Sequence, residues 1–294
     1  MKKTVFTGAG VALVTPLNEK GVDYEAMGKI IDFQIENGTQ ALLICGTTGE
    51  APTLDDREHL DAIAFAVERA AKRVPVIAGT GSNNTDHAVM MNKEAYKLGA
   101  DALLWVSPYY NKTTQRGLIK HYQTLAASVD LPAIIYNVPS RTGVDIQAKT
   151  VCELSKTENI VGIKEATGNV ARSAEIIAEC GDKIDVYSGN DDITVPLMSI
   201  GAKGVLSVLS NIMPAENQKM CRLCLDGDFV SAGKMQIKLD RLIKALFSEV
   251  NPIPVKTALN LMGLNAGLLR LPLYEMAEEN LEFLKSAMHE NGLI

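Results

Sequence analysis

The sequence predicts a (β/α)8 barrel followed by a helical extension. Short apolar segments and amphipathic helical segments alternate eight times within about 225 residues, a length that suits a barrel of this class. The alternative with the same alternation is an open, doubly wound sheet, which usually has fewer strands and one glycine-rich phosphate-binding turn. Neither a GxGxxG motif nor a P-loop occurs in the chain. The barrel is therefore the preferred prediction.

The predicted strands are short and apolar throughout, as parallel strands buried beneath helices are. The helical segments carry apolar residues at i, i+3, i+4 spacing, and the second one shows this at Leu60, Ile63, Ala64, Val67 and Ala71. The strands are expected at residues 8–15, 39–45, 74–79, 102–107, 132–136, 160–164, 184–188 and 204–208. Four helices are expected at residues 23–37, 54–73, 114–128 and 214–225. Four more are expected to end at residue 98, near residue 156, before residue 181 and at residue 200.

Three more helices are expected after the barrel, at residues 227–250, 254–262 and 274–290. Asn251-Pro252-Ile253-Pro254 and Leu271-Pro272 separate them. No linker rich in serine, glycine or proline precedes them, so we expect this part to pack on the barrel. The predicted domains are a catalytic barrel at residues 1–226 and a three-helix extension at residues 227–294.

The composition favours a cytoplasmic globular protein. Apolar residues make up 47% of the chain and charged residues 22%, which allows a full hydrophobic core. The formal net charge of −6 argues against a surface for nucleic acid or for an anionic membrane. No segment has the roughly 18 consecutive apolar residues of a membrane span, and no signal peptide is recognisable. The five cysteines are scattered, which fits reduced thiols, and we interpret the pair Cys221 and Cys224 as structural.

Lys164 ends the sixth predicted strand, Ile160 to Lys164, and is the most unusual of the strand-end residues. Burial at such a position favours the neutral form of the amine and lowers its pKa. A neutral amine is what a Schiff-base nucleophile needs. The alternative is a lysine that extends from the strand end to solvent. From this stretch alone, both interpretations remain open.

Other polar residues follow the carboxyl ends of the predicted strands, where barrel enzymes hold their active sites. Gly46-Thr47-Thr48-Gly49-Glu50 brings backbone amides and two hydroxyls close to an anion, although the same residues suit a turn that caps the next helix. Tyr109 and Tyr110 follow the fourth strand, where paired aromatics suit a subunit interface. Tyr136 ends the fifth strand and offers a proton, and Arg141 offers a planar cation for a carboxylate.

The seventh strand ends in Gly189, which leaves room for a ligand, and then in Asp191 and Asp192. We interpret the two aspartates as the N-cap and first turn of the next helix. A metal site is the alternative, but no histidine or carboxylate cluster supports it, so we expect no metal. Together, a strand-end lysine, several hydroxyls and an arginine predict Schiff-base chemistry on a small oxo-acid, of the class I aldolase or dehydratase type.

Three motifs together resemble the dihydrodipicolinate synthase family, pyruvate-dependent lyases related to N-acetylneuraminate lyase. They are Gly46-Thr47-Thr48-Gly49-Glu50, Tyr136-Asn137-Val138-Pro139 with Arg141-Thr142, and Val161-Gly162-Ile163-Lys164-Glu165. The resemblance covers the whole chain, including the helical extension. It implies a barrel that condenses pyruvate with L-aspartate 4-semialdehyde to 4-hydroxy-tetrahydrodipicolinate, in lysine and diaminopimelate biosynthesis. It implies no cofactor, and a homotetramer built as a dimer of dimers.

The resemblance also implies a role for each matching residue. Lys164 would form the Schiff base with pyruvate and Tyr136 would move protons, while Thr47 would link Tyr136 to Tyr110 of a neighbouring subunit. Thr48 and the Thr47 amide would hold the pyruvate carboxylate. Arg141 would bind the carboxylate of the second substrate, and Gly189 and Leu206 would line the site near Lys164.

Arg141 separates the possible activities, because family members that cleave sialic acid or keto-deoxy sugars lack an arginine there. A non-catalytic barrel is the hypothesis from a different class, but the chain keeps every group that the mechanism needs. A sugar-acid aldolase is the nearer rival.

In family members that lysine inhibits, a histidine, an asparagine, a glutamate and a tyrosine bind lysine at a subunit interface. Asn83 and Tyr109 match that pattern, and His59 matches another histidine that lines the site. The expected histidine is replaced by Asp56 and the expected glutamate by His87. A histidine does not replace a carboxylate that faces an ammonium group, so we expect weak or absent lysine inhibition.

Overall fold

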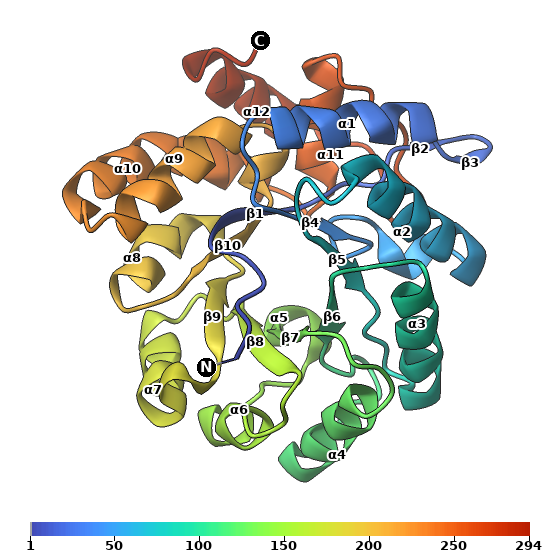
Figure 1. The fold of residues 1–294 in the computed structure, drawn as a ribbon. Coiled ribbons are helices and arrows are strands. Elements are labelled where there is room, and N and C mark those ends of the chain that lie inside the picture. Colours follow the sequence, from blue (N-terminus) through green and yellow to red (C-terminus); the bar gives the residue numbers. More distant parts are fainter. Residues whose placement is uncertain (1) are drawn as a thin grey trace.

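The protein is a closed barrel of eight parallel strands, shown in Figure 1 by a computed structural model that describes residues 2–294. The order around the barrel is β1-β10-β9-β8-β7-β6-β5-β4. Pairing of β1 with β10 closes the ring, with Gly8 opposite Gly204. The barrel strands are β1 (Gly8–Ala12), β4 (Ala41–Ile44), β5 (Val76–Gly79), β6 (Ala102–Val106), β7 (Ala133–Asn137), β8 (Ile160–Glu165), β9 (Asp185–Ser188) and β10 (Gly204–Ser207). Each lies within or overlaps one of the eight predicted strands, so the predicted fold class is confirmed.

Helices surround the strands, and several begin where a polar side chain accepts a hydrogen bond from the first helical turn. Asp23, Asn84, Thr114 and Asn169 cap helices in this way, and Asp55 forms a reciprocal capping box with Glu58. The outer helices are α1 (Tyr24–Glu36), α2 (Asp56–Ala70), α3 (Thr85–Lys97), α4 (Gln115–Ala126), α6 (Ala148–Leu154), α7 (Val170–Cys180), α8 (Thr194–Ser199) and α9 (Pro214–Leu225).

Two short elements were not predicted from the periodicity of the sequence. A hairpin of β2 (Leu17–Asn18) and β3 (Gly21–Val22) lies between β1 and α1, and a single helical turn, α5 (Pro139–Thr142), follows β7. Two-residue strands and four-residue helices are too short to show a repeat. The turn of α5 matters for the site because it carries Arg141.

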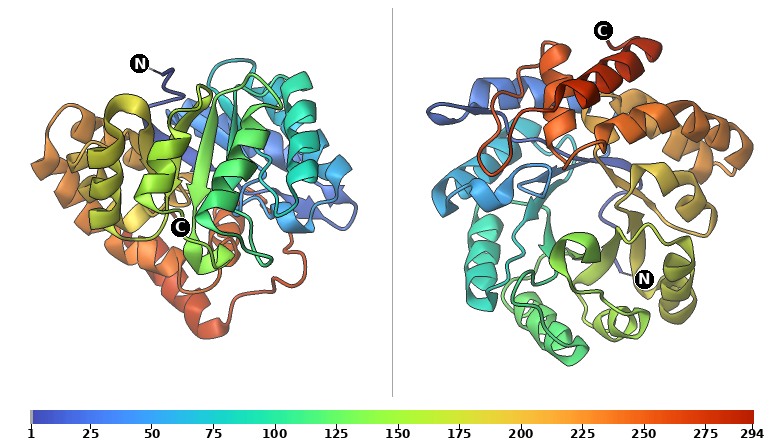
Figure 2. Two further views of the ribbon diagram at one scale, coloured as in Figure 1. Left: turned by 90° about the horizontal axis from the view of Figure 1, so that it is seen from below. Right: turned by 180° about the vertical axis from the view of Figure 1, so that it is seen from behind.

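The chain ends in three helices, α10 (Phe229–Leu246), α11 (Ile253–Leu261) and α12 (Glu278–Glu290). The third begins later than residue 274, the predicted start, because Ala277 has extended backbone angles and serves as its N-cap. Figure 2 (left) shows the N-terminus at one end of the barrel and the red α12 at the other. Because α9 and α10 pack against each other, the division of the chain at residue 226 stays a prediction.

The barrel interior is filled by side chains. Phe6, which precedes β1, stacks on Tyr187 with ring centroids 4.5 Å apart, and the Tyr187 hydroxyl donates a hydrogen bond to the Phe6 carbonyl. The larger core lies between the strands and the helices that cover them. Chemistry is therefore confined to the carboxyl end of the strands, as in other barrels. The interior cluster consists of Phe6, Ala12, Ala41, Leu43, Ile77, Ala102, Leu104, Ile134, Tyr136, Val138, Tyr187 and Leu206.

Candidate active site

Lys164 lies inside the barrel near the carboxyl end of β8, with only 5% of its surface exposed. Its register partner on β7 is Tyr136, and its ammonium nitrogen lies 4.6 Å from the centre of the Tyr136 ring. Burial lowers the pKa of Lys164 to about 8, while the charge of Asp191 raises it and that of Arg141 lowers it. The alternative, a lysine that extends to solvent, is therefore wrong.

Asp191 is the charged partner of Lys164, and sequence reasoning assigned it a different role. Its buried carboxylate accepts hydrogen bonds from the Ser207 hydroxyl and from the backbone amides of Val208, at 3.0 Å, and Leu209, at 2.9 Å. Asp191 does open a helical turn, as predicted, but its side chain binds the end of β10 instead of capping that turn. Burial raises the pKa of Asp191, and the hydrogen bonds and Lys164 lower it.

The ends of β7 and β8 are fixed by Asn137, which sequence reasoning did not single out. Its side-chain amide donates to Glu165 at 3.0 Å and to Asp145 at 2.9 Å, and its oxygen accepts the Ile146 amide. Glu165 follows Lys164 in the chain. Its side chain is buried, and this burial raises the pKa of Glu165. This network keeps the neighbouring Tyr136 and Lys164 in register.

The structure brings Tyr136 and Thr47 together but leaves Tyr110 apart. Burial raises the pKa of the Tyr136 hydroxyl, while Arg141 and a hydrogen bond with the Thr47 side chain lower it. Tyr110 is 91% exposed and has a left-handed backbone, with φ of 67°. Within one chain, the three residues of the expected relay are therefore not assembled.

Thr48 lies in the loop after β4, and this loop contacts the C-terminal extension. The Asn251 side-chain amide donates to the Thr48 hydroxyl at 3.0 Å, and the Asn251 carbonyl accepts from the guanidinium of Arg141 at 3.1 Å. Asn251 thus joins the two residues expected to hold substrate carboxylates. The sequence showed Asn251 only as part of a proline-rich break between helices. Its side-chain oxygen is buried and has no hydrogen-bond partner among residues 2–294.

Gly189 lies against the lysine because it has no side chain. A Cβ atom at this position would be 3.1 Å from Cε of Lys164 and 2.6 Å from Cβ of Ala166. Leu206, on β10, is fully buried inside the barrel in the same apolar cluster as Tyr136. Both residues therefore lie in the part of the fold where the sequence placed them.

The residues expected at a regulatory site lie near the β5 and β6 ends. The His59 ring forms a 2.7 Å hydrogen bond with the Gly79 carbonyl, and burial lowers the pKa of His59. Asn83 donates to the Tyr109 carbonyl at 3.2 Å. The two departures from the family pattern pair with each other: the His87 ring lies 2.9 Å from the Asp56 carboxylate.

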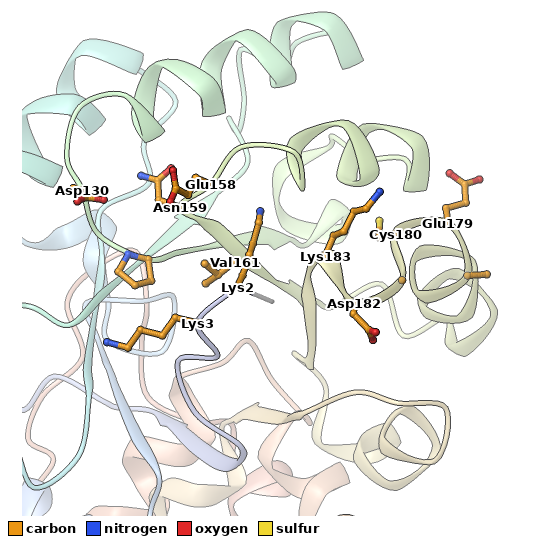
Figure 3. Close-up of a pocket in the computed structure, with 13 residues that line it drawn as sticks. Lys2, Lys3, Asp130, Glu158, Asn159, Val161, Glu179, Cys180, Asp182 and Lys183 are labelled. Atoms are coloured by element: carbon orange, nitrogen blue, oxygen red, sulfur yellow. The ribbon is translucent and has the colours of Figure 1, made fainter.

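Several features of residues 2–294 outside the strand ends bear on other kinds of site. No group of three histidine, cysteine, aspartate or glutamate residues within the described chain is arranged to hold a metal ion. None of the helices in residues 2–294 is both long and apolar enough to cross a membrane. A cavity of about 900 Å³, shown in Figure 3, lies at the amino end of the barrel, opposite Lys164. Its lining includes side chains of both charges: Lys2, Lys3 and Lys183, and Asp130, Glu158, Glu179 and Asp182.

The chain is similar to proteins of known name over its full length. It matches the Dihydrodipicolinate synthetase family over residues 5–291. A 4-hydroxy-tetrahydrodipicolinate synthase from Thermoanaerobacter sp. (strain X514) is 55% identical over 291 residues, which cover 99% of this chain and 98% of that protein.

Two solved structures share the fold and add bound molecules. The chloride-inhibited dihydrodipicolinate synthase from Acinetobacter baumannii, in complex with pyruvate, is 45% identical with a TM-score of 0.97, covering 99% of this chain and 100% of that one. The enzyme from Cyanidioschyzon merolae with lysine bound is 38% identical with a TM-score of 0.96, also covering 99% and 100%. The chain therefore belongs to the dihydrodipicolinate synthetase family.

Proposed function

We propose that this protein is a lyase that condenses pyruvate with L-aspartate 4-semialdehyde to 4-hydroxy-tetrahydrodipicolinate, in lysine and diaminopimelate biosynthesis. The observation that carries the proposal is Lys164, buried against Tyr136 at the carboxyl end of the barrel. The names of the similar proteins and the pyruvate in one related structure support the same activity.

The lowered pKa of Lys164 prepares the first step. With a pKa of about 8, about a quarter of the amine is neutral at pH 7.5, compared with about one part in a thousand at the ordinary 10.5. The neutral amine attacks the ketone carbon of pyruvate and forms a carbinolamine. Loss of water then leaves the imine. The proposed reaction needs only the amine of Lys164 and proton transfers, so it uses no cofactor.

Tyr136 moves the protons of this sequence. It gives a proton to the carbinolamine oxygen that leaves as water, and it receives one when the imine becomes an enamine. The enamine carbon then attacks the aldehyde carbon of the second substrate. The amine of that substrate finally attacks the imine carbon, which closes the ring and releases Lys164. Thr47 passes protons between Tyr136 and Tyr110, which a neighbouring subunit contributes.

Two groups hold the substrate carboxylates. Thr48 and the Thr47 amide bind the carboxylate of pyruvate, and the guanidinium of Arg141 binds that of the aldehyde. Gly189 and Leu206 shape the space beside the imine. Arg141 favours this activity over sugar-acid cleavage, whose aldehyde is an uncharged polyol.

We propose that the enzyme works in the cytoplasm as a homotetramer, a dimer of dimers. The exposed side chain of Tyr110 supports this assembly, because a residue expected in the proton relay is here free to enter a neighbouring subunit. Because the chain carries a net negative charge, we propose neither a nucleic acid nor a membrane as a partner.

We also propose that lysine inhibits this enzyme weakly or not at all. The related enzyme from Cyanidioschyzon merolae has lysine bound, and Asn83, Tyr109 and His59 match residues of lysine-binding family members. In this chain, however, Asp56 and His87 replace two of the ligands and pair with each other. That pairing removes the free carboxylate that a lysine ammonium group would need.

Borohydride reduction in the presence of pyruvate tests the proposed function, with mass mapping of the modified peptide. The expected result is one pyruvate adduct on Lys164, and none in a Lys164→Met variant or on the other buried lysine, Lys256. Turnover of L-aspartate 4-semialdehyde should accompany it. An adduct without turnover of this aldehyde would move the assignment to a sugar-acid lyase, and the absence of any adduct would refute Schiff-base chemistry.

A further inference from the structure

The loop that carries Thr47 and Thr48 is held from outside the barrel. We call residues 46–53 the β4 loop. Three residues of the C-terminal extension contact it: Asn251 through the Thr48 hydroxyl, Lys256 through the Glu50 carboxylate, and Arg270, which donates to the Thr53 carbonyl at 2.8 Å. The extension is therefore part of the wall of the candidate active site.

The ion pair of Lys256 and Glu50 is the most deeply buried of these contacts. The two charged atoms lie 2.6 Å apart, and the side chains are 1% and 0% exposed. The Lys256 ammonium also donates to the carbonyls of Thr15, at 3.1 Å, and Leu268. The second oxygen of Glu50 accepts the backbone amide of Arg270 at 3.2 Å. Each ammonium proton has an acceptor and each carboxylate oxygen a donor.

Thr15, which follows β1, also contacts the β4 loop. Its hydroxyl donates to the Gly49 carbonyl at 2.7 Å, while its carbonyl accepts from Lys256. The lysine thus holds the loop directly, through Glu50, and indirectly, through Thr15. Within the loop itself, the amides of Gly49 and Ala51 donate to the Gly46 carbonyl at 3.1 and 3.4 Å, and the Glu50 amide donates to the Thr47 carbonyl at 3.2 Å.

The backbone of the loop needs such support. Cys45, which precedes the loop, and Glu50, within it, both have left-handed backbone angles with φ of 54°. Such angles cost about 1–2 kcal/mol for a residue other than glycine. A buried ion pair adds little net stability, because desolvation of the two charges offsets their attraction. Its directed hydrogen bonds do, however, specify one geometry for the loop.

We propose that Lys256 is a positioning residue for the reaction: through Glu50 it fixes Thr47 and Thr48 where the pyruvate carboxylate binds. The proposal rests on the proposed function, which assigns that carboxylate to the β4 loop. It gives the C-terminal extension a part in substrate binding, although no atom of Lys256 touches a substrate.

The variant Lys256→Met tests this, because methionine has similar length and no charge. The pyruvate concentration that half-saturates borohydride trapping at Lys164 should rise on the order of tenfold, since a misplaced loop binds the carboxylate poorly. A purely structural role would instead reduce the amount of active enzyme and leave this concentration unchanged. Lys244→Met is the matched control, because Lys244 pairs with Asp240 on the exposed face of α10. It should trap pyruvate as the parent protein does.

A second variant covers the case in which Lys256→Met does not fold. In Lys256→Met with Glu50→Leu, no unpaired charge stays buried, so folding should recover, yet the directed hydrogen bonds to the loop are gone. Its half-saturating pyruvate concentration should be raised as well. An unchanged value in either folded variant overturns the positioning role, and so does failure of both to fold, which would assign Lys256 to stability. Absence of trapping in the parent protein would refute the proposed function instead.

Discussion

Lys164 and Tyr136 are register partners on adjacent strands, with the lysine nitrogen 4.6 Å from the centre of the tyrosine ring. Because the strands are parallel and paired through Asn137 and Glu165 as well, this relationship is fixed by backbone and side-chain hydrogen bonds together. The amine and the hydroxyl that carry the proposed chemistry thus both lie on hydrogen-bonded strands.

The pH dependence of imine formation should report the charge of Lys164. Since its pKa is lowered to about 8, the rate should rise with pH up to about 8 and level off above it, instead of rising to 10.5. The rate of borohydride-trapped adduct formation across pH 6 to 10 measures this. A rate still rising steeply above pH 9 would contradict the lowered pKa.

Asp191→Asn should move that midpoint to lower pH. The Asp191 carboxylate favours the charged form of Lys164, so its removal should lower the lysine pKa further. Asp192→Asn is the matched control, because Asp192 is the next residue in the chain and its side chain is exposed. Equal profiles for both variants and the parent would exclude the proposed electrostatic partnership.

Gly189→Ala should impair both stability and imine formation. The added methyl group would press against Lys164 and Ala166, and such overpacking costs about 1–3 kcal/mol of the free energy of unfolding. Gly233→Ala, in α10, is the control: no atom lies within 4 Å of the added Cβ, so helix propensity should stabilise that variant slightly. Thermal melts and adduct formation rates check both, and a native rate in Gly189→Ala would show that the lysine tolerates the methyl group.

Tyr110→Phe should lower turnover on the order of a hundredfold while leaving the fold intact, because it removes one hydroxyl from the proposed relay. The side chain is exposed, so the melting temperature of the chain should hardly change. Tyr96→Phe is the control, because it removes the hydroxyl of another exposed tyrosine, on α3, and should have no effect on turnover. Unchanged turnover in Tyr110→Phe would argue against the relay between subunits.

Lysine should fail to inhibit at sub-millimolar concentration. Asp56→His combined with His87→Glu restores the family's ligand types and separates the present pair, so this double variant should become more sensitive. Initial rates across a lysine titration test both proteins. Half-inhibition of the parent chain below 1 mM would refute the expectation of weak feedback.

The fold was predictable because its signals are local. Each strand is an apolar run followed by a helix of regular spacing, and Lys164, Tyr136 and Gly189 could be placed because they end such runs. The contacts of Asp191, Asn251 and Lys256 were not predictable in this way. Each meets a residue that is distant in sequence, and a pattern within one segment contains no information about which distant segment it will contact.

Tyr110 illustrates a different limit. Its position after a strand was clear from the sequence, yet one folded chain leaves it away from Tyr136. Where a residue acts in another subunit, neither the local pattern nor the structure of one chain contains the contact. The same holds for the arrangement of the proposed tetramer.

Phe6 stacks on Tyr187 inside the barrel, so side chains fill its interior toward the amino end. In the proposed reaction, both substrates would therefore reach Lys164 from the carboxyl end of the strands, where α5 carries Arg141. Pyruvate would bind to Lys164 first, and the aldehyde would then approach the enamine from the same end. Because the two substrates would share one approach, we expect pyruvate to bind first and an excess of the aldehyde to slow pyruvate binding.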